Sequence, residues 1–186
     1  MKKVFDKIIK GNKSKPQLEG VHYTNEKLEL TDANIAIIEE YKQPLNTSFD
    51  FLVGIDSKPK IVNYPELTRI VPTNNTNKFV IDIPLLESIV KLNKKEFGLE
   101  LTKDGLINGN KVGYFERDVF DFFDHITFSP KLLLIMIEYL KESGLKKNAT
   151  MLLSNSALKP AVIFFEETNS NNTFIITPIR TEKDMK

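Results

Sequence analysis

The chain has 186 residues, of which 41% are apolar and 27% are charged, and its formal net charge is +1. These values are typical of globular proteins, so we expect neither a disordered chain nor a membrane protein. The chain has no cysteine, which excludes disulfides, thiolate nucleophiles and cysteine metal sites. With no secretory signal pattern at its start, we expect a cytoplasmic location.

The basic residues are distributed unevenly between the two types. There are 23 lysines and only three arginines. Lysine is a point charge that suits phosphate, whereas arginine makes the bidentate contacts that read base edges. Any nucleic-acid role is therefore expected to be independent of sequence.

The first third of the chain predicts one helix followed by short strands. Residues Lys2–Lys10 carry apolar side chains on one helical side, and Lys3, Lys7 and Lys10 on another. The segment Tyr64–Asn77 contains two prolines and a polar run, which predicts a linker or a domain joint. The expected strands are Leu18–Tyr23, Lys27–Leu30, Ile35–Tyr41, Phe49–Ile55 and Lys60–Asn63.

A strand, helix and further strands are then predicted. Phe79–Ile81 forms the strand, Asp82 caps the helix and Pro84 lies in its first turn. The helix is expected to bury an apolar stripe made of Leu85, Leu86, Ile89 and Val90, with Lys91, Lys94 and Lys95 opposite. The following strands are Phe97–Thr102, Leu106–Asn108 and Lys111–Arg117.

The same order of elements then returns. A strand at His125–Phe128 leads to Ser129 as cap, and a helix runs from Pro130 to Ser143. Pro84 and Pro130 are about 46 residues apart, which indicates an internal repeat, and the first 70 residues resemble a third, degenerate copy. The last strands are Thr150–Ser154, Ala161–Phe165 and Thr173–Pro178. Because the connections are short, this organisation predicts an α+β fold with antiparallel sheets.

The second predicted helix is apolar on more than one side. Seven of the nine residues from Leu132 to Leu140 are aliphatic and another is Tyr139, a stripe too broad for one buried face. Two interpretations remain open: the helix lies between a sheet and a neighbouring helix, or part of it meets a partner.

Enzymatic motifs are weak. We find no glycine-rich phosphate loop and no catalytic triad pattern. An acidic cluster with one histidine could bind a divalent cation, although interleaved apolar residues favour a connecting segment; it comprises Glu116, Asp118, Asp121, Asp124 and His125. His22, within a predicted strand, is expected to be an ordinary surface or hydrogen-bonded histidine. We therefore predict a protein without enzymatic activity, metal or cofactor, and a metal-dependent enzyme at the acidic cluster is the minor alternative.

Several stretches carry motifs that occur together in one known family: Lys15–Val21 leading to Leu30–Asp32, Tyr64–Pro72, and the C-terminal segments Ser156–Ile163 and Phe174–Thr181. The C-terminal segments resemble the closing strands of the bacterial DNA polymerase sliding clamp, the DNA polymerase III beta subunit family. The first stretch is similar to the strand-turn-strand of that family, and the second to its joint between the middle and last domains. The three matches occur in the order found in the family.

The resemblance implies a clamp-like α+β fold: antiparallel sheets with helices on one face, built from repeated helix-plus-strands half-domains. Residues 1–73 would form a truncated half-domain, 74–181 a complete domain and 182–186 a tail. The chain is about half the length of the family, with the first domain absent. With three half-domains per chain, four copies would supply the twelve of a family ring, so a homo-oligomer is possible, while an open or monomeric form is equally allowed.

The resemblance also implies two sites. Non-specific contact with double-stranded DNA would involve Lys3, Lys7, Lys10, Lys91, Lys94 and Lys95. A pocket for a short peptide from a DNA polymerase or another replication or repair protein would involve Leu18, Thr31, Pro72, Leu132, Leu158, Pro160, Ile175, Thr177, Pro178, Ile179 and Arg180. The implied function is a sliding-clamp-like processivity or replication-associated factor. The alternative is a peptide-binding adaptor or decoy of replication proteins that forms no ring.

Overall fold

The computed structural model describes the chain except for residues 1, 11–14, 73–76, 117–124, 155 and 182–186. The chain divides into two compact units. Unit 1 comprises residues 1–71 and 164–175, and unit 2 comprises residues 72–163 and 176–186.

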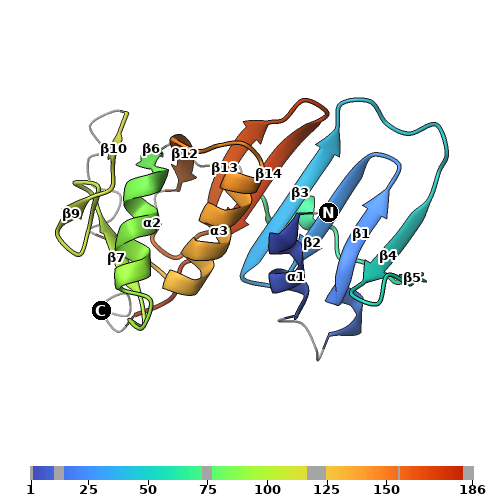
Figure 1. The fold of residues 1–186 in the computed structure, drawn as a ribbon, viewed down its shortest axis with the longest axis horizontal. Coiled ribbons are helices and arrows are strands. Elements are labelled where there is room, and N and C mark those ends of the chain that lie inside the picture. The colour runs from blue at the N-terminus through green and yellow to red at the C-terminus, as the bar shows by residue number, and fades with distance from the viewer. Residues whose placement is uncertain (1, 11–14, 73–76, 117–124, 155, 182–186) are drawn as a thin grey trace. The chain divides into compact units, whose positions relative to one another are not determined.

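Unit 1 is a sheet with one α-helix against one face (Figure 1). The helix α1 spans Lys3–Ile9. The strand order is β14-β3-β2-β1-β4-β5, and the pairs β1–β2, β1–β4, β2–β3 and β4–β5 are antiparallel. The strands are β1 (Gly20–Thr24), β2 (Lys27–Thr31), β3 (Ile35–Tyr41), β4 (Asp50–Gly54), β5 (Pro59–Lys60) and β14 (Ser170–Ile176).

The core of unit 1 lies between α1 and the sheet. Val4, Phe5, Ile8 and Ile9 are all buried, because the spacing i, i+1, i+4, i+5 places them on one side of the helix. Each such side chain contributes roughly 1.5–3 kcal/mol when it leaves water. The predicted helix over Lys2–Lys10 is thus confirmed, one residue shorter at each end.

The other side of the unit 1 sheet is contacted by the predicted linker. The ring of Tyr64 stacks on that of His22 with 4.4 Å between centroids, and Leu67 is buried within the 3₁₀ turn η3 (Leu67–Ile70). A second 3₁₀ turn, η2, spans Pro16–Leu18. The first half of the predicted linker Tyr64–Asn77 is therefore a packed segment, because Tyr64 and Leu67 supply apolar anchors that the proline-rich composition concealed.

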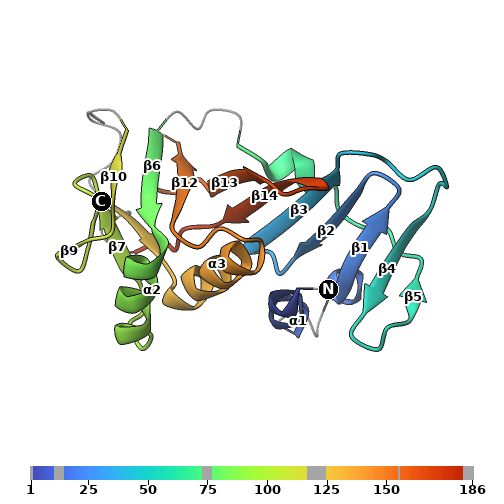
Figure 2. The same ribbon diagram turned by 45° about the horizontal axis from the view of Figure 1, so that its top comes forward.

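Unit 2 contains two α-helices and two sheets, ordered β10-β6-β12-β13 and β11-β7-β8-β9. The helices α2 (Ile83–Leu92) and α3 (Pro130–Glu142) lie side by side in front of the strands (Figures 1 and 2). The strands of the first half are β6 (Asn77–Asp82), β7 (Leu99–Thr102), β8 (Leu106–Ile107), β9 (Asn110–Lys111) and β10 (Gly113–Phe115). Those of the second half are β11 (His125–Phe128), β12 (Asn148–Leu153) and β13 (Ala161–Glu166).

The predicted repeat is present in unit 2 as two halves that exchange strands. The first strand of each half pairs antiparallel with the strand that follows the helix of the other half: β6 with β12, and β11 with β7. Each half therefore completes a sheet of the other. The α+β class with antiparallel sheets is confirmed.

Three predicted features of the first half of unit 2 were wrong. Helix α2 ends at Leu92, so Lys94 and Lys95 lie in the turn that follows it rather than on the helix. Leu85, predicted within the buried stripe, is 42% exposed, because the helix begins at Ile83 and this residue takes the buried position. Strand β7 begins two residues later than predicted and leaves Phe97 exposed.

Candidate functional site

Helix α2 and the turn that follows it carry the first group of predicted DNA-facing lysines. The Asp82 carboxylate caps the helix by accepting a hydrogen bond from the backbone N–H of Leu85 at 2.9 Å. This start places Leu86, Ile89 and Val90 in the core and leaves Lys91 exposed. Lys94 and Lys95, in the turn after the helix, are also exposed.

An ion-pair cluster joins the two helices of unit 2. The carboxylate of Glu87 accepts hydrogen bonds from Lys91 on its own helix and from Lys141 on α3, both at 2.8 Å. The bond from Lys141, then that from Lys91, lowers the pKa of Glu87. Since one carboxylate faces two ammonium groups, the cluster keeps an excess positive charge.

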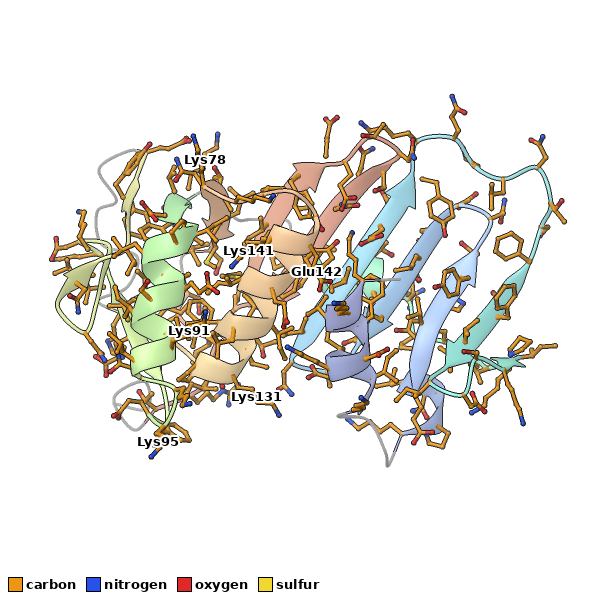
Figure 3. The ribbon with its side chains drawn as sticks, in the orientation of Figure 1. Lys78, Lys91, Lys95, Lys131, Lys141 and Glu142 are labelled. Carbon is orange, nitrogen blue, oxygen red and sulfur yellow. The ribbon has the colours of Figure 1, made fainter. Side chains whose placement is uncertain are left out.

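Two further lysines belong to this surface, and the sequence reasoning missed them. Figure 3 shows Lys131 and Lys141 on α3, with Lys91 and Lys95 at and beyond the end of α2. Lys131 and Lys141 are exposed, whereas seven apolar side chains of α3 between Leu132 and Leu140 are buried. The polar residues at positions 131, 138, 141 and 142 could have identified them, because a narrow polar stripe on a broadly apolar helix indicates its solvent-facing side.

Unit 1 presents the second group of predicted lysines. Lys3 and Lys7 are exposed on α1, opposite its buried side, and Lys10, which directly follows the helix, is also exposed. Lys2, which precedes the helix, instead donates to Glu39 at 2.5 Å and to Glu167 at 2.6 Å. It therefore joins α1 to β3 and to the turn before β14.

The exposed lysines favour one kind of ligand. Ammonium groups on flexible stems suit phosphate oxygens and supply no fixed pattern of donors for reading bases. These helix surfaces can therefore attract a polyanion electrostatically.

The residues predicted for the peptide pocket are distributed over both units. In unit 1, Leu18, Thr31 and Ile175 are buried. The Thr31 hydroxyl donates to the carbonyl of Ile35 at 2.6 Å, so it is already used within the sheet turn. Ile175 is 1% exposed and lies in the core of the unit.

The remaining predicted pocket residues belong to unit 2. Leu132 is buried in α3, Leu158 is 44% exposed, and Arg180 is exposed. Ile179 donates its backbone N–H to the carbonyl of Thr127 at 2.8 Å. The half-buried members of the set are Pro72, Pro160, Thr177, Pro178 and Ile179.

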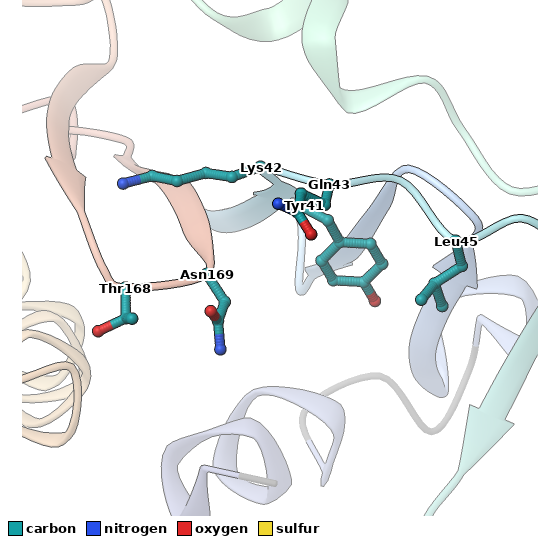
Figure 4. Close-up of a pocket in the computed structure, with 6 residues that line it drawn as sticks. All are labelled: Tyr41, Lys42, Gln43, Leu45, Thr168 and Asn169. Carbon is teal, nitrogen blue, oxygen red and sulfur yellow. The ribbon is translucent and has the colours of Figure 1, made fainter.

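The described part of unit 1 contains two hollows that no predicted pocket residue lines. The larger has a volume of about 500 Å³ and is shown in Figure 4; its lining is Tyr41, Lys42, Gln43, Leu45, Thr168 and Asn169. The smaller, of about 270 Å³, lies near the end of α1 and is lined by Ile9, Lys10, Glu19, Gly54, Ile55, Asp56 and Lys60. The peptide pocket stays a prediction.

His22 belongs to a buried polar cluster of unit 1. Its Nε2 lies 2.8 Å from Asp50 and its Nδ1 lies 3.3 Å from Glu29, which in turn accepts from Lys27 at 2.9 Å. Burial opposes the charge on His22, but the two carboxylates outweigh it and raise the pKa of His22. The prediction of a hydrogen-bonded histidine is confirmed.

Asp118, Asp121 and Asp124, the central members of the predicted acidic cluster, lie outside the described residues. Among the residues that the structure describes, no group of three or more metal-ligating side chains is arranged to hold an ion. None of the described helices is long and apolar enough to cross a membrane.

Comparison with solved structures identifies the fold. The DNA polymerase III beta subunit of Thermotoga maritima aligns with 96% of this chain at a TM-score of 0.69 and 15% sequence identity. That of Pseudomonas aeruginosa gives the same TM-score at 14% identity, and that of Borrelia burgdorferi gives 0.68 at 16%. The chain thus has the fold of bacterial sliding clamps, as its sequence predicted.

The alignments cover only part of those clamps. The chain spans 62%, 63% and 61% of the Thermotoga, Pseudomonas and Borrelia subunits, respectively. No protein-family model matches the sequence, and no curated protein matches it significantly. The likeness is therefore one of fold.

Proposed function

We propose that this chain is a shortened, non-enzymatic sliding-clamp-like protein of DNA replication. It holds double-stranded DNA without reading its sequence and docks a short peptide of a DNA polymerase or another replication or repair protein. The observation that carries the proposal is a clamp fold over 96% of the chain whose α-helices expose lysine on the side away from the core. Its mechanism makes and breaks no covalent bond.

The DNA half of the proposal rests on Lys91, Lys94 and Lys95 of unit 2 and Lys3, Lys7 and Lys10 of unit 1, all exposed. Each phosphate contact releases a condensed counterion, so affinity falls steeply with salt. Exposed lysines on and beside helices give such contacts with a duplex whatever its sequence.

Binding of two unrelated duplexes, followed by fluorescence anisotropy at rising salt, tests this half. Both duplexes should bind equally at low salt. Joint replacement of Lys91, Lys94 and Lys95 by alanine should weaken binding roughly tenfold and reduce the salt slope by about one per lost contact. A matched control replaces Lys103, Lys111 and Lys159, which are exposed in unit 2 but lie outside α2, α3 and the turn that follows α2. Equal losses in both variants, or no binding at low salt, would refute the DNA half.

The peptide half rests on the likeness of the C-terminal segment to the family and on the exposed side chain of Leu158. Short apolar anchors supply most of the energy of such complexes. Selection of a displayed library of short linear peptides on the immobilised chain should yield binders that Leu158→Glu abolishes. Leu45→Glu, at a side chain of similar exposure in unit 1, should leave them bound. Binders that respond to neither change would contradict the predicted pocket.

The second candidate, a peptide-binding adaptor or decoy that forms no ring, is favoured by the net charge of +1, which provides little overall field to attract DNA. It predicts peptide binding without DNA binding, so the two experiments together separate the candidates.

A further inference from the structure

Unit 1 has the same order of secondary-structure elements as one half of unit 2. Its chain runs through a helix, α1, and three strands, β1 to β3, and then through β4, which pairs antiparallel with β1. In unit 2 the first half runs through α2 and its strands, and β11 then pairs antiparallel with β7. Strand β11 leads directly into α3, whereas β4 leads into the two-residue strand β5. Among the described residues of unit 1, α1 is the sole α-helix.

The two paired strands can be compared position by position. In each unit, the strand after the helix ends at a threonine whose hydroxyl accepts a backbone N–H at the next turn: Thr24 from Lys27, and Thr102 from Leu106. Aligned on these threonines, the cross-strand pair Tyr23–Phe51 of unit 1 corresponds to Leu101–Ile126 of unit 2.

Burial of the equivalent pairs differs. In unit 2, where both halves are present, Leu101 is 2% exposed and Ile126 is 1% exposed. In unit 1, Tyr23 and Phe51 are only half-buried. The next pair repeats the difference, since Val53 is half-buried while its equivalent, Phe128, is 1% exposed.

The half-buried residues form a continuous aromatic face on the α1 side of the sheet. Phe51 contacts Tyr23 and Phe49, with ring centroids 5.9 and 5.3 Å apart. Tyr41 lies two residues after Glu39 on the same side of β3, and its ring points into the 500 Å³ hollow beside Leu45 (Figure 4). Helix α1 has only seven residues and leaves β4 uncovered (Figures 1 and 2).

We infer that this aromatic face is an interface with unit 1 of a second copy of the chain. The second copy would bring one helix and one four-stranded layer, β4-β1-β2-β3, so that the pair would hold two helices and two sheets, as unit 2 does within one chain. Because unit 2 is built from two halves with the same order of elements, two identical halves can form the same arrangement about a two-fold axis. The inference goes beyond the proposed function and stands without it.

The edge of the sheet argues for contact through the face and against pairing edge to edge. The outermost strand, β5, consists of the two residues Pro59 and Lys60 and is preceded by Lys58. Proline and lysine on a short edge strand prevent another strand from adding there. Aromatic rings that are half-buried in one copy gain contact area when a second face meets them.

Light scattering coupled to size exclusion, over a wide range of protein concentration, tests this inference. The average mass should rise to twice that of one chain. Phe51→Glu should raise the dissociation constant roughly tenfold or more, as expected for an aromatic anchor at an interface. Phe97→Glu, at an exposed phenylalanine of unit 2, should leave it unchanged. A wild-type chain that stays monomeric, or a dimer that Phe51→Glu does not weaken, would overturn the inference.

A second measurement covers the case in which Phe51→Glu does not fold. The chain has no cysteine, so Val53→Cys introduces a single thiol at the edge of the aromatic face. Its reaction with a small maleimide should slow as protein concentration rises, whereas the thiol introduced by Phe97→Cys should react at a constant rate. A Val53→Cys thiol whose reactivity is independent of concentration would overturn the inference without any need for the charged variant.

Discussion

The two units of this chain show how the same local pattern gives different surfaces when its complement is present or absent. In unit 2, the strand pair β7–β11 buries Leu101 and Ile126 completely. In unit 1, the equivalent pair β1–β4 leaves Tyr23 and Phe51 half-buried. The burial of these strand residues therefore depends on the neighbouring half of the repeat, because a helix-plus-strands half has one apolar face that another half must cover.

The largest expected effect contrasts the equivalent positions in the two units. Ile126→Ala should cost about 2–5 kcal/mol of the free energy of unfolding, since the side chain is fully buried. Phe51→Ala, measured at high dilution, should cost less although it removes more carbon atoms, because the ring is partly in water before the change. Urea denaturation measures the loss of unfolding free energy in both variants. A larger loss for Phe51→Ala than for Ile126→Ala would contradict the difference in burial between the two units.

The ion pairs that fix α1 should have the next largest effect. Lys2 bridges Glu39 and Glu167, and the side chains of all three are less than one-third exposed. Lys2→Ala should lower the free energy of unfolding by about 1–3 kcal/mol, because two partly buried carboxylates each lose a charged hydrogen-bond donor. A matched change, Lys3→Ala, removes an exposed lysine from the same helix and should cost little. Equal costs would show that Lys2 does not fix the helix.

The polar cluster on the other side of the unit 1 sheet should make stability depend on pH. Because the pKa of His22 is raised by Glu29 and Asp50, its contribution to stability is complete below the ordinary histidine pKa of about 6.5 and is lost as pH rises through the raised value. The urea midpoint should therefore fall across that window. In His22→Gln the same fall should be absent, and an unchanged pH profile in this variant would assign the dependence to other groups.

The smallest effect is expected at the bridge between the helices of unit 2. Lys141→Ala removes one of the two lysines that hold Glu87, and both lysines are more than 40% exposed. Exposed ion pairs contribute roughly 0–1 kcal/mol, so thermal melting should barely change. The same variant should weaken DNA binding if this surface holds phosphate, which separates the two roles of Lys141. A large loss of stability would show that the helices depend on this pair.

Most of the fold could be predicted from the sequence because the residues at the helix starts are ones that cap a helix or fit its first turn. Asp82 and Pro84 marked the start of α2, and Pro130 marked the start of α3, as the structure has them. Prediction failed where contacts distant in sequence decide the outcome. Tyr64 packs on His22 from a segment whose composition indicated a linker or a domain joint, because the local sequence pattern does not show a contact with a residue 42 positions away.

The candidate site was less predictable than the fold. Exposed lysines on α1 and α2 could be predicted from helical spacing. Lys131 and Lys141 were missed because most residues of α3 are apolar, so the sequence indicated the buried sides of this helix more clearly than its exposed side. The peptide pocket was carried over from a resemblance rather than from spacing. Ile175, one of its proposed members, is 1% exposed, and its neighbours Phe174 and Ile176 in β14 are buried as well.

Hydrogen exchange with and without a non-specific DNA duplex at low salt tests the central claim most directly, because it reports every part of both units in one experiment. The account predicts slower exchange in residues 3–10, 91–95 and 131–141 and unchanged exchange in β5, β8 and β9. Protection confined to those strands, or no protection anywhere, would contradict the claim that the lysine-bearing helices hold DNA.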